Sequence, residues 1–174
     1  FSLRSYDVHE CIFVHITRSA GTSVAKSLFG ELPYHYTASE FRLIFGRRRF
    51  NQYYKFAFVR NPWDRLCSAY SHLKGSGWNE KDQAWSNDNI AHIAEFSDFA
   101  LNWLTLEKLN SHIHFWPQSR FLCDSKGRPI IDQLYYLEAL QADFSPATKK
   151  LQLESLLQNT NASSRGSYRA IDSN

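Results

Sequence analysis

The sequence predicts an α/β fold in which a short central parallel β-sheet is flanked by helices. Two observations carry this prediction: residues 11–16 (CIFVHI) and 55–60 (KFAFVR) are largely apolar runs of strand length, and each is followed by a turn and an amphipathic helix. The 174 residues contain no internal repeat and no linker rich in Gly, Pro and Ser, and 43% of them are hydrophobic. We therefore expect one domain over residues 1–174.

The first strand leads into the turn TRSAGTS, residues 17–23. We expect the next helix to begin near Thr22 or Ser23 as N-cap, to bury Val24 and Leu28, and to end at Gly30. A turn that leads into a helix N-terminus presents unpaired backbone N–H groups and the positive end of the helix dipole. The hydroxyls and the arginine of this turn add to that potential, so it is predicted to bind phosphate or sulfate.

After the second strand, Asn61 is the expected N-cap, Pro62 the first helical residue and Gly75 the end of the helix. The i, i+3, i+4, i+7 spacing predicts a core-facing side made of Trp63, Leu66, Cys67 and Tyr70. A polar side is expected to continue from Arg60 through Asn61, Asp64 or Arg65, and Ser68. Ligands of such sheets lie beyond the carboxyl ends of the strands, where both the turn and Arg60 are predicted to lie.

The second half of the chain gives simpler predictions. Ser97 or Asp98 is expected to cap a helix, and two short extended segments should flank the turn at residues 125–128. Ser145 and Pro146 are expected to open the last helix.

Charge and cysteine content narrow the function classes. A formal charge of +3 is far below that of a duplex-binding surface, so no nucleic-acid partner is expected.

Cys11, Cys67 and Cys123 are widely spaced among apolar residues, which favours buried free thiols and a cytoplasmic location. No apolar run reaches the length of a membrane span. The chain contains no methionine, so a Golgi-lumen location is the alternative if an upstream anchor has been removed.

HITRSAGTS (residues 15–23) resembles the 5′-phosphosulfate loop of sulfotransferases, and FAFVRNPWDRLCSAY (residues 56–70) resembles their 3′-phosphate motif. IHFWPQSRFLCD, LEALQADF and NASSRGSYR also resemble the carboxyl-terminal half of the carbohydrate branch, which includes the heparan-sulfate type and short bacterial-like members. The resemblance implies a P-loop NTPase-like three-layer fold and a donor, 3′-phosphoadenosine 5′-phosphosulfate, whose product is 3′,5′-adenosine bisphosphate. The implied acceptor is a hydroxyl group, on a carbohydrate by resemblance to this branch.

By the family pattern, the phosphosulfate would be held by Arg18, Ser19, Ala20 (through its backbone), Gly21, Thr22 and Ser23. Arg60 and Ser68 would hold the 3′-phosphate, since a guanidinium at a strand end and a hydroxyl on the next helix can converge on one phosphate. Ser164 and Arg165 align with a late loop that covers the nucleotide, with a flexible tail as the alternative reading. No set of metal-binding carboxylates accompanies the turn, so no metal is expected in the reaction.

The sequence departs from the family pattern at Thr17-Arg18, where the family has Pro-Lys. The family lysine stabilises charge on the bridging oxygen; Arg18 keeps a fixed positive charge but is a poorer proton donor. A non-catalytic sulfonucleotide-binding or regulatory domain is therefore the alternative function. A nucleotide kinase is disfavoured, because the triphosphate-binding motif GxxxxGK[ST] is absent.

The acceptor hydroxyl requires a general base, and His35 is the first choice. It lies between the two motifs, where related carbohydrate enzymes carry a histidine. Glu31 and Glu40 are the weaker alternatives. A structural role is expected for His15, because its neighbours on the first strand are apolar.

Overall fold

The computed structural model describes residues 3–152, except 33, 76 and 78. Its elements, in chain order, are α1 (Arg4–Val8), β1 (Cys11–Phe13), α2 (Gly21–Phe29), α3 (Ala38–Gln52), β2 (Tyr54–Val59), α4 (Pro62–Lys74), α5 (Glu80–Asn89), α6 (Phe96–Asp98), the π-helical turn η1 (Phe99–Trp103), α7 (Leu106–Leu109), α8 (Gln118–Leu122), β3 (Gln133–Tyr136), the 3-10 turn η2 (Leu137–Ala139) and α9 (Leu140–Lys150).

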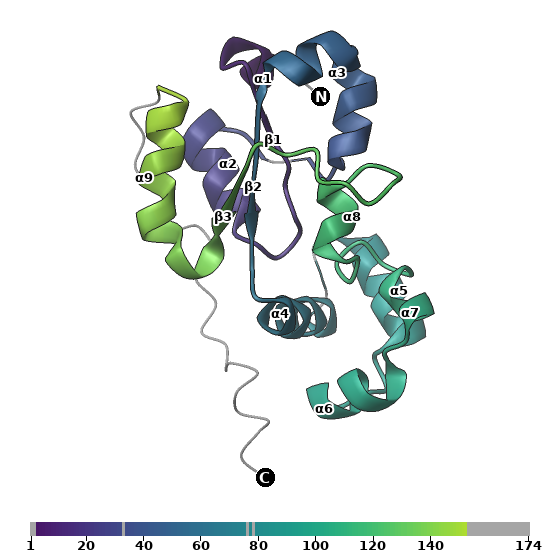
Figure 1. Cartoon of the computed structure of the whole chain (residues 1–174). Coiled ribbons are helices and arrows are strands. Elements are labelled where there is room, and N and C mark those ends of the chain that lie inside the picture. The colour runs from purple at the N-terminus through teal and green to yellow at the C-terminus, as the bar shows by residue number, and fades with distance from the viewer. Residues whose placement is uncertain (1–2, 33, 76, 78, 153–174) are drawn as a thin grey trace. The chain divides into compact units, whose positions relative to one another are not determined.

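The three strands form one parallel sheet in the order β1-β2-β3, which confirms the predicted fold class. The central strand β2 is buried along Phe56, Ala57 and Phe58, so side chains on both of its faces are covered. Figure 1 shows α2 and α9 on one side of the sheet and α3 and α8 on the other. The crossover through α2 and α3 carries the chain from β1 to β2, as parallel neighbours require.

The chain divides into two compact units. Among the described residues, the sheet unit comprises residues 3–60 and 117–152, and the helical unit comprises residues 61–116. The single domain expected over residues 1–174 stays a prediction.

Aromatic side chains fill the core of the sheet unit. Phe13 on β1 and Phe56 on β2 stack with their ring centroids 5.2 Å apart, and both are at most 1% exposed. Cys11 on β1 is fully buried, and burial raises the pKa of its thiol to about 12. All three cysteines are free, as the sequence predicts, but Cys67 and Cys123 are only partly buried, so the expected burial holds for Cys11 alone.

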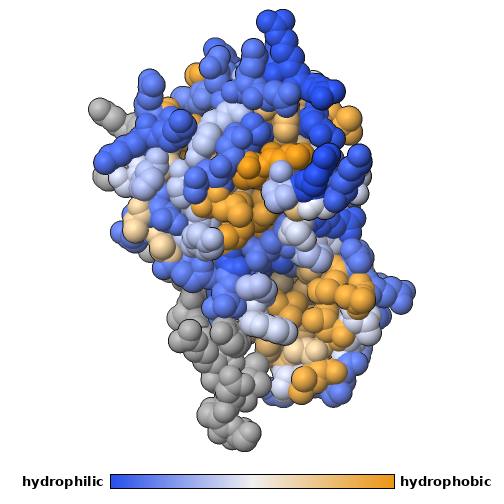
Figure 2. All heavy atoms as spheres, in the orientation of Figure 1, coloured by the Kyte–Doolittle hydropathy of each residue, from blue (hydrophilic) through white to orange (hydrophobic). Residues whose placement is uncertain are grey.

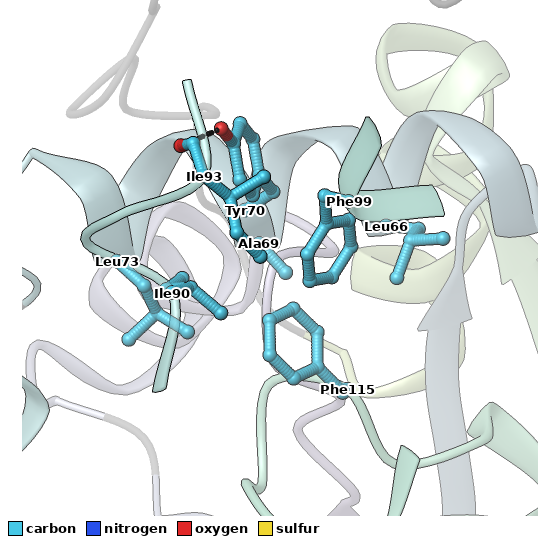
Figure 3. Packing of buried hydrophobic residues seen from close by; sticks show 8 residues of the cluster. All are labelled: Leu66, Ala69, Tyr70, Leu73, Ile90, Ile93, Phe99 and Phe115. Atoms are coloured by element: carbon cyan, nitrogen blue, oxygen red, sulfur yellow. Dashed lines mark hydrogen bonds between the residues drawn. The ribbon is translucent and has the colours of Figure 1, made fainter. Parts of the chain in front are cut away.

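The helical unit has its own apolar cluster, drawn in Figure 3. Its buried members come from α4 and from the segments after α5: Leu66, Ala69, Tyr70, Leu73, Ile90, Ile93, Phe99 and Phe115. The Tyr70 hydroxyl donates to the Ile93 carbonyl at 2.9 Å, as Figure 3 shows, so the one polar atom of this ring is satisfied inside the cluster.

The ends of α4 follow the sequence prediction. The Asn61 side chain accepts from the N–H groups of Trp63 and Asp64, Pro62 is the first helical residue and Gly75 is the C-cap. The predicted core face, however, is wrong in part. Trp63 is 58% exposed, whereas Arg65 and Ser68 are 5% exposed. The buried apolar side chains are Leu66, Ala69, Tyr70 and Leu73, an i, i+3, i+4, i+7 set that begins one turn later than expected.

Two other helix starts differ from the sequence prediction. The helix at residue 96 has Glu95 as N-cap, without a side-chain hydrogen bond, instead of Ser97 or Asp98. Helix α9 begins at Leu140 and carries Pro146 inside it. Burial of Phe144 and Ala147 stabilises α9 around this proline, which cannot donate to the preceding turn. Of the two extended segments expected around residues 125–128, the second is confirmed by the bridge at Pro129 and by β3, whereas the first is wrong in part, because residues 120–122 belong to α8.

Polar residues cover most of the drawn face in Figure 2, and apolar patches interrupt it. Over the described residues, no helix combines the length and the apolar character that a bilayer span requires.

Candidate functional site

The turn between β1 and α2 is the centre of the candidate site. Arg18 and Ala20 both adopt left-handed backbone conformations, with φ of 66° and 59°. Such angles are unfavourable for residues with a Cβ, and they occur preferentially in ligand-binding turns. Side chains alternate along the turn: Thr17, Ser19 and Gly21 are buried, whereas Arg18, Ala20 and Thr22 are partly exposed. The partly exposed residues are thus available to a ligand.

Helix α2 begins at Gly21, with Ala20 as N-cap, so the predicted N-cap at Thr22 or Ser23 is wrong. The first intrahelical hydrogen bond runs from the N–H of Val24 to the carbonyl of Ala20, at 3.0 Å. Alanine supplies no side-chain cap, and the first turn of a helix carries N–H groups without intrahelical partners. The helix therefore offers backbone donors and a positive dipole end to an anion.

His15 packs directly on Gly21, the first residue of α2. A Cβ placed on Gly21 would lie 1.6 Å from Cδ2 of His15, so only glycine allows this approach. His15 is 5% exposed, and its ring lies 4.5 Å from that of His35. The structure thus brings the exposed His35 into contact with a histidine that packs on the start of α2.

Arg60 reaches the same turn from the end of β2. Its Nη1 donates to the carbonyl oxygen of Arg18 at 3.3 Å. Because β1 and β2 are parallel, their carboxyl ends meet at one edge of the sheet, as the sequence predicts. Two guanidinium-bearing residues, Arg18 and Arg60, therefore belong to one electropositive region.

Gln118, on α8, fixes the backbone of Arg60 from the other side. Its Oε1 accepts from the Arg60 N–H at 3.0 Å, and its Nε2 donates to the Arg60 carbonyl at 2.7 Å. The amide thus replaces the two hydrogen bonds that a neighbouring strand would make. No local pattern in the sequence marks Gln118 as a site residue, although it lies in the family-like segment IHFWPQSRFLCD.

Ser19 provides a test of whether the turn fits an anionic ligand. It is 1% exposed, and its Oγ has no hydrogen-bond partner among the described residues. A buried hydroxyl without a partner costs free energy, and a phosphate or sulfate oxygen is an acceptor that would satisfy it. Together with the uncapped helix start, this hydroxyl fits the phosphosulfate of the predicted donor.

The alternative general bases have structural partners. The Glu40 carboxylate closes the capping box of α3, accepting from both the N–H and the hydroxyl of Thr37. Glu31 accepts a hydrogen bond from Ser5 at 2.9 Å. Neither carboxylate contacts the turn through these bonds, whereas the His35 ring packs on His15.

Two predicted nucleotide-binding groups stay predictions. Ser68 is buried on α4 and belongs to the helical unit, whereas Arg60 belongs to the sheet unit. Ser164 and Arg165 lie outside the described residues.

The comparison with protein families identifies the class of protein to which the chain belongs. A model described as the sulfotransferase family matches residues 33–171. The chain belongs to the sulfotransferase family. Membership supports sulfuryl transfer as the general activity of this sulfotransferase. Searches of curated proteins and of solved structures gave no match.

The matched range includes Arg60 and the motif around it but begins after the turn at residues 17–23. The assignment of that turn in this sulfotransferase therefore depends on its geometry: the uncapped start of α2, the buried Ser19 hydroxyl and the bond from Arg60 to the Arg18 carbonyl.

Proposed function

We propose that this sulfotransferase transfers a sulfuryl group from 3′-phosphoadenosine 5′-phosphosulfate to a hydroxyl group of a carbohydrate. The observation that carries the proposal is the hydrogen bond from Arg60 to the Arg18 carbonyl. It links the residue that resembles the 3′-phosphate ligand to the turn that resembles the phosphosulfate loop. A donor with anionic groups at both ends of an adenosine suits this pair of cationic residues.

The residues of the turn have separate roles in this proposal. The N–H groups at the start of α2 and the hydroxyls of Ser19, Thr22 and Ser23 bind and orient the phosphosulfate. The donor supplies an activated sulfuryl group, whose bond to the 5′-phosphate oxygen breaks as its bond to the acceptor oxygen forms. Arg18 stabilises the negative charge that develops on the 5′-phosphate oxygen, without donating a proton.

His35 accepts the proton of the acceptor hydroxyl. Its ring is exposed and packs at 4.5 Å on His15, which is fixed against Gly21. Because the buried His15 ring packs on it, the His35 imidazole can keep its orientation while it contacts an acceptor that enters from solvent.

The alternative function, a non-catalytic sulfonucleotide-binding or regulatory domain, is favoured by Arg18 itself. The guanidinium replaces the family lysine, and it remains protonated under all ordinary conditions. Both functions require nucleotide binding, and only the first requires sulfated product.

The test is calorimetric titration with 3′,5′-adenosine bisphosphate and with ADP, on the natural chain and on Arg60→Ala. We expect the bisphosphate to bind much more tightly than ADP. Arg60→Ala should lose more than about 1.5 kcal/mol of binding free energy, roughly tenfold in affinity or more. Arg128→Ala, which removes an exposed arginine paired with Asp124, is the matched control and should bind normally. Circular dichroism checks that each variant is folded. Equal binding of ADP by the natural chain would overturn the donor assignment.

If bisphosphate binding is confirmed, transfer of radioactive sulfate to a panel of glycans, with simple alcohols as a comparison, separates the two functions. Labelled glycan supports the carbohydrate acceptor, and label on non-carbohydrate alcohols alone contradicts it. Tight nucleotide binding with no product from any acceptor favours the non-catalytic alternative.

A further inference from the structure

Three histidines and one aspartate gather inside the helical unit. His72 comes from α4, Asp82 from α5, and His112 and His114 from the segment after α7. Their side chains are only 10–12% exposed. All four lie within residues 61–116, and neither the turn at residues 17–23 nor Arg60 belongs to this cluster.

Two of the imidazoles face the same carboxylate oxygen. Nε2 of His72 lies 3.9 Å from Oδ2 of Asp82, and Nε2 of His114 lies 3.8 Å from the same oxygen. One ligand atom from each of these three residues lies within 4.8 Å of the other two. These separations are too long for direct hydrogen bonds, which rarely exceed about 3.2 Å. They exceed, by about half an ångström, the spacing of about 3.3 Å between ligand atoms that bond a tetrahedral zinc ion at about 2.0–2.1 Å, so a small adjustment of the side chains would bring them to that spacing.

His112 determines which oxygen of Asp82 faces the other two histidines. The backbone N–H of His114 donates to Nδ1 of His112 at 3.3 Å, so the neutral ring carries its proton on Nε2. That nitrogen lies 3.4 Å from Oδ1 of Asp82. An imidazole N–H directed at Oδ1 leaves Oδ2 to the other two rings, which is how outer residues orient metal-binding carboxylates.

The backbone packs closely on Asp82 as well. Gly77 has φ of 65°, and a Cβ on it would lie 2.3 Å from the Cβ of Asp82. At the start of α5, the Asn79 side chain accepts from the Asp82 N–H at 3.0 Å. Two local constraints thus hold the position of the carboxylate before any ion binds.

A carboxylate held by hydrogen bonds to imidazoles alone is the simpler interpretation of such a cluster. It predicts donor to acceptor distances near 2.7–3.0 Å. Here two ring nitrogens instead stand 3.8 and 3.9 Å from one oxygen, and they lie on different elements. The convergence of three ligand atoms around a common point, at low exposure, favours an ion between them.

We propose that His72, Asp82 and His114 bind one Zn²⁺ ion. Two imidazoles and one carboxylate form a donor set that suits zinc and leave its fourth position to water. The ion links α4, α5 and the segment at residues 112–114, so its binding stabilises the helical unit. The proposal does not depend on the sulfuryl-transfer function, and it gives the ion no part in that reaction.

The experiment uses the full chain, stripped with EDTA and dialysed. Calorimetric titration with ZnCl₂ and metal analysis after gel filtration should give one zinc ion per chain. Excess zinc should raise Tm by at least about 4 °C. His72→Gln, Asp82→Asn and His114→Gln should each abolish this binding, and His112→Gln should weaken it by about 10- to 100-fold. His92→Gln, which replaces an exposed histidine of the same unit, is the matched control and should bind normally.

The absorption spectrum of the Co²⁺-substituted chain keeps the test valid if a variant fails to fold. Nitrogen and oxygen ligands give d–d bands without the thiolate charge-transfer band that Cys11, Cys67 or Cys123 would produce. A spectrum of this kind, lost in His72→Gln, supports the site. The absence of saturable binding, a thiolate band, or binding unchanged in both His72→Gln and His114→Gln would overturn the proposal.

Discussion

The ring of His15 occupies the space into which a Cβ of Gly21 would project, 1.6 Å from Cδ2. This contact joins the segment just after the first strand to the first residue of α2. A histidine just after the strand and a glycine at the start of the helix thus act as one structural pair.

Gly21→Ala should therefore destabilise the chain and weaken binding of 3′,5′-adenosine bisphosphate. Forcing a methyl group into a filled core position typically costs about 1–3 kcal/mol. Urea unfolding measures this loss. The double variant His15→Ala with Gly21→Ala should recover part of the stability relative to Gly21→Ala, because the smaller side chain at position 15 makes room for the methyl group. If the two losses simply add, the steric explanation is wrong.

Ser19→Ala should separate folding from ligand binding. The buried Oγ has no hydrogen-bond partner among the described residues, so its removal should leave the unfolding free energy of the ligand-free chain unchanged or slightly higher. The same change should lower the affinity for 3′-phosphoadenosine 5′-phosphosulfate, because the hydroxyl is predicted to bind the phosphosulfate. Differential scanning calorimetry with and without the nucleotide measures both effects. A clear loss of stability without ligand would show that Ser19 has a structural role instead.

Arg18→Lys should raise kcat at least about tenfold and leave the dissociation constant of 3′,5′-adenosine bisphosphate nearly unchanged. Both side chains are cationic, but an ammonium is more compact and can donate a proton to a leaving oxygen. The left-handed backbone at residue 18 does not distinguish the two residues. Single-turnover kinetics with saturating donor provides the measurement. Lower turnover in the lysine variant would show that the guanidinium is the better catalytic group in this site.

Much of the fold follows from local patterns. The apolar runs that became β1 and β2, the capping of α4 by Asn61 and the end of α2 at Gly30 each depend on nearby residues. The N-cap at Ala20 was not predicted, because the preference for a hydroxyl-bearing N-cap favours Thr22 or Ser23, whereas the left-handed backbone of the turn ends at Ala20 and the helix follows at once.

Site residues that belong to a local sequence motif could be predicted. Contacts between segments that are distant in the sequence could not. Arg18 and Arg60 could be inferred because each follows a strand of the same sheet. Gln118 lies 58 residues from Arg60, and only the folded chain shows that its amide pairs with that backbone. The cluster around Asp82 is similar, since His72 and His114 come from separate elements and have no characteristic metal-ligand spacing.

His35→Asn should lower kcat by about 10²- to 10⁴-fold and leave nucleotide affinity unchanged, as expected for loss of a general base that contacts the acceptor. His9→Asn, on the partly exposed histidine next to α1, is the matched control and should retain full turnover. Initial rates at saturating donor and acceptor, together with calorimetric titration, make the comparison. Equal activity of the two variants would exclude His35 as the base.

Arg65→Ala should destabilise the chain more than Trp63→Ala, although the larger apolar residue would be expected to matter more. The Arg65 side chain is buried, and its Nη1 donates to the carbonyl of Trp116 at 2.9 Å, whereas Trp63 is 58% exposed. Removing the arginine takes this donor away from the Trp116 carbonyl and creates a cavity. The free energy of unfolding should fall by about 2 kcal/mol or more. Truncating the exposed indole should cost less than about 1 kcal/mol. Chemical unfolding of the two variants side by side provides the measurement. A larger loss of stability for Trp63→Ala would support the core face that the sequence predicts, with Trp63 buried, and would contradict the burial pattern of α4.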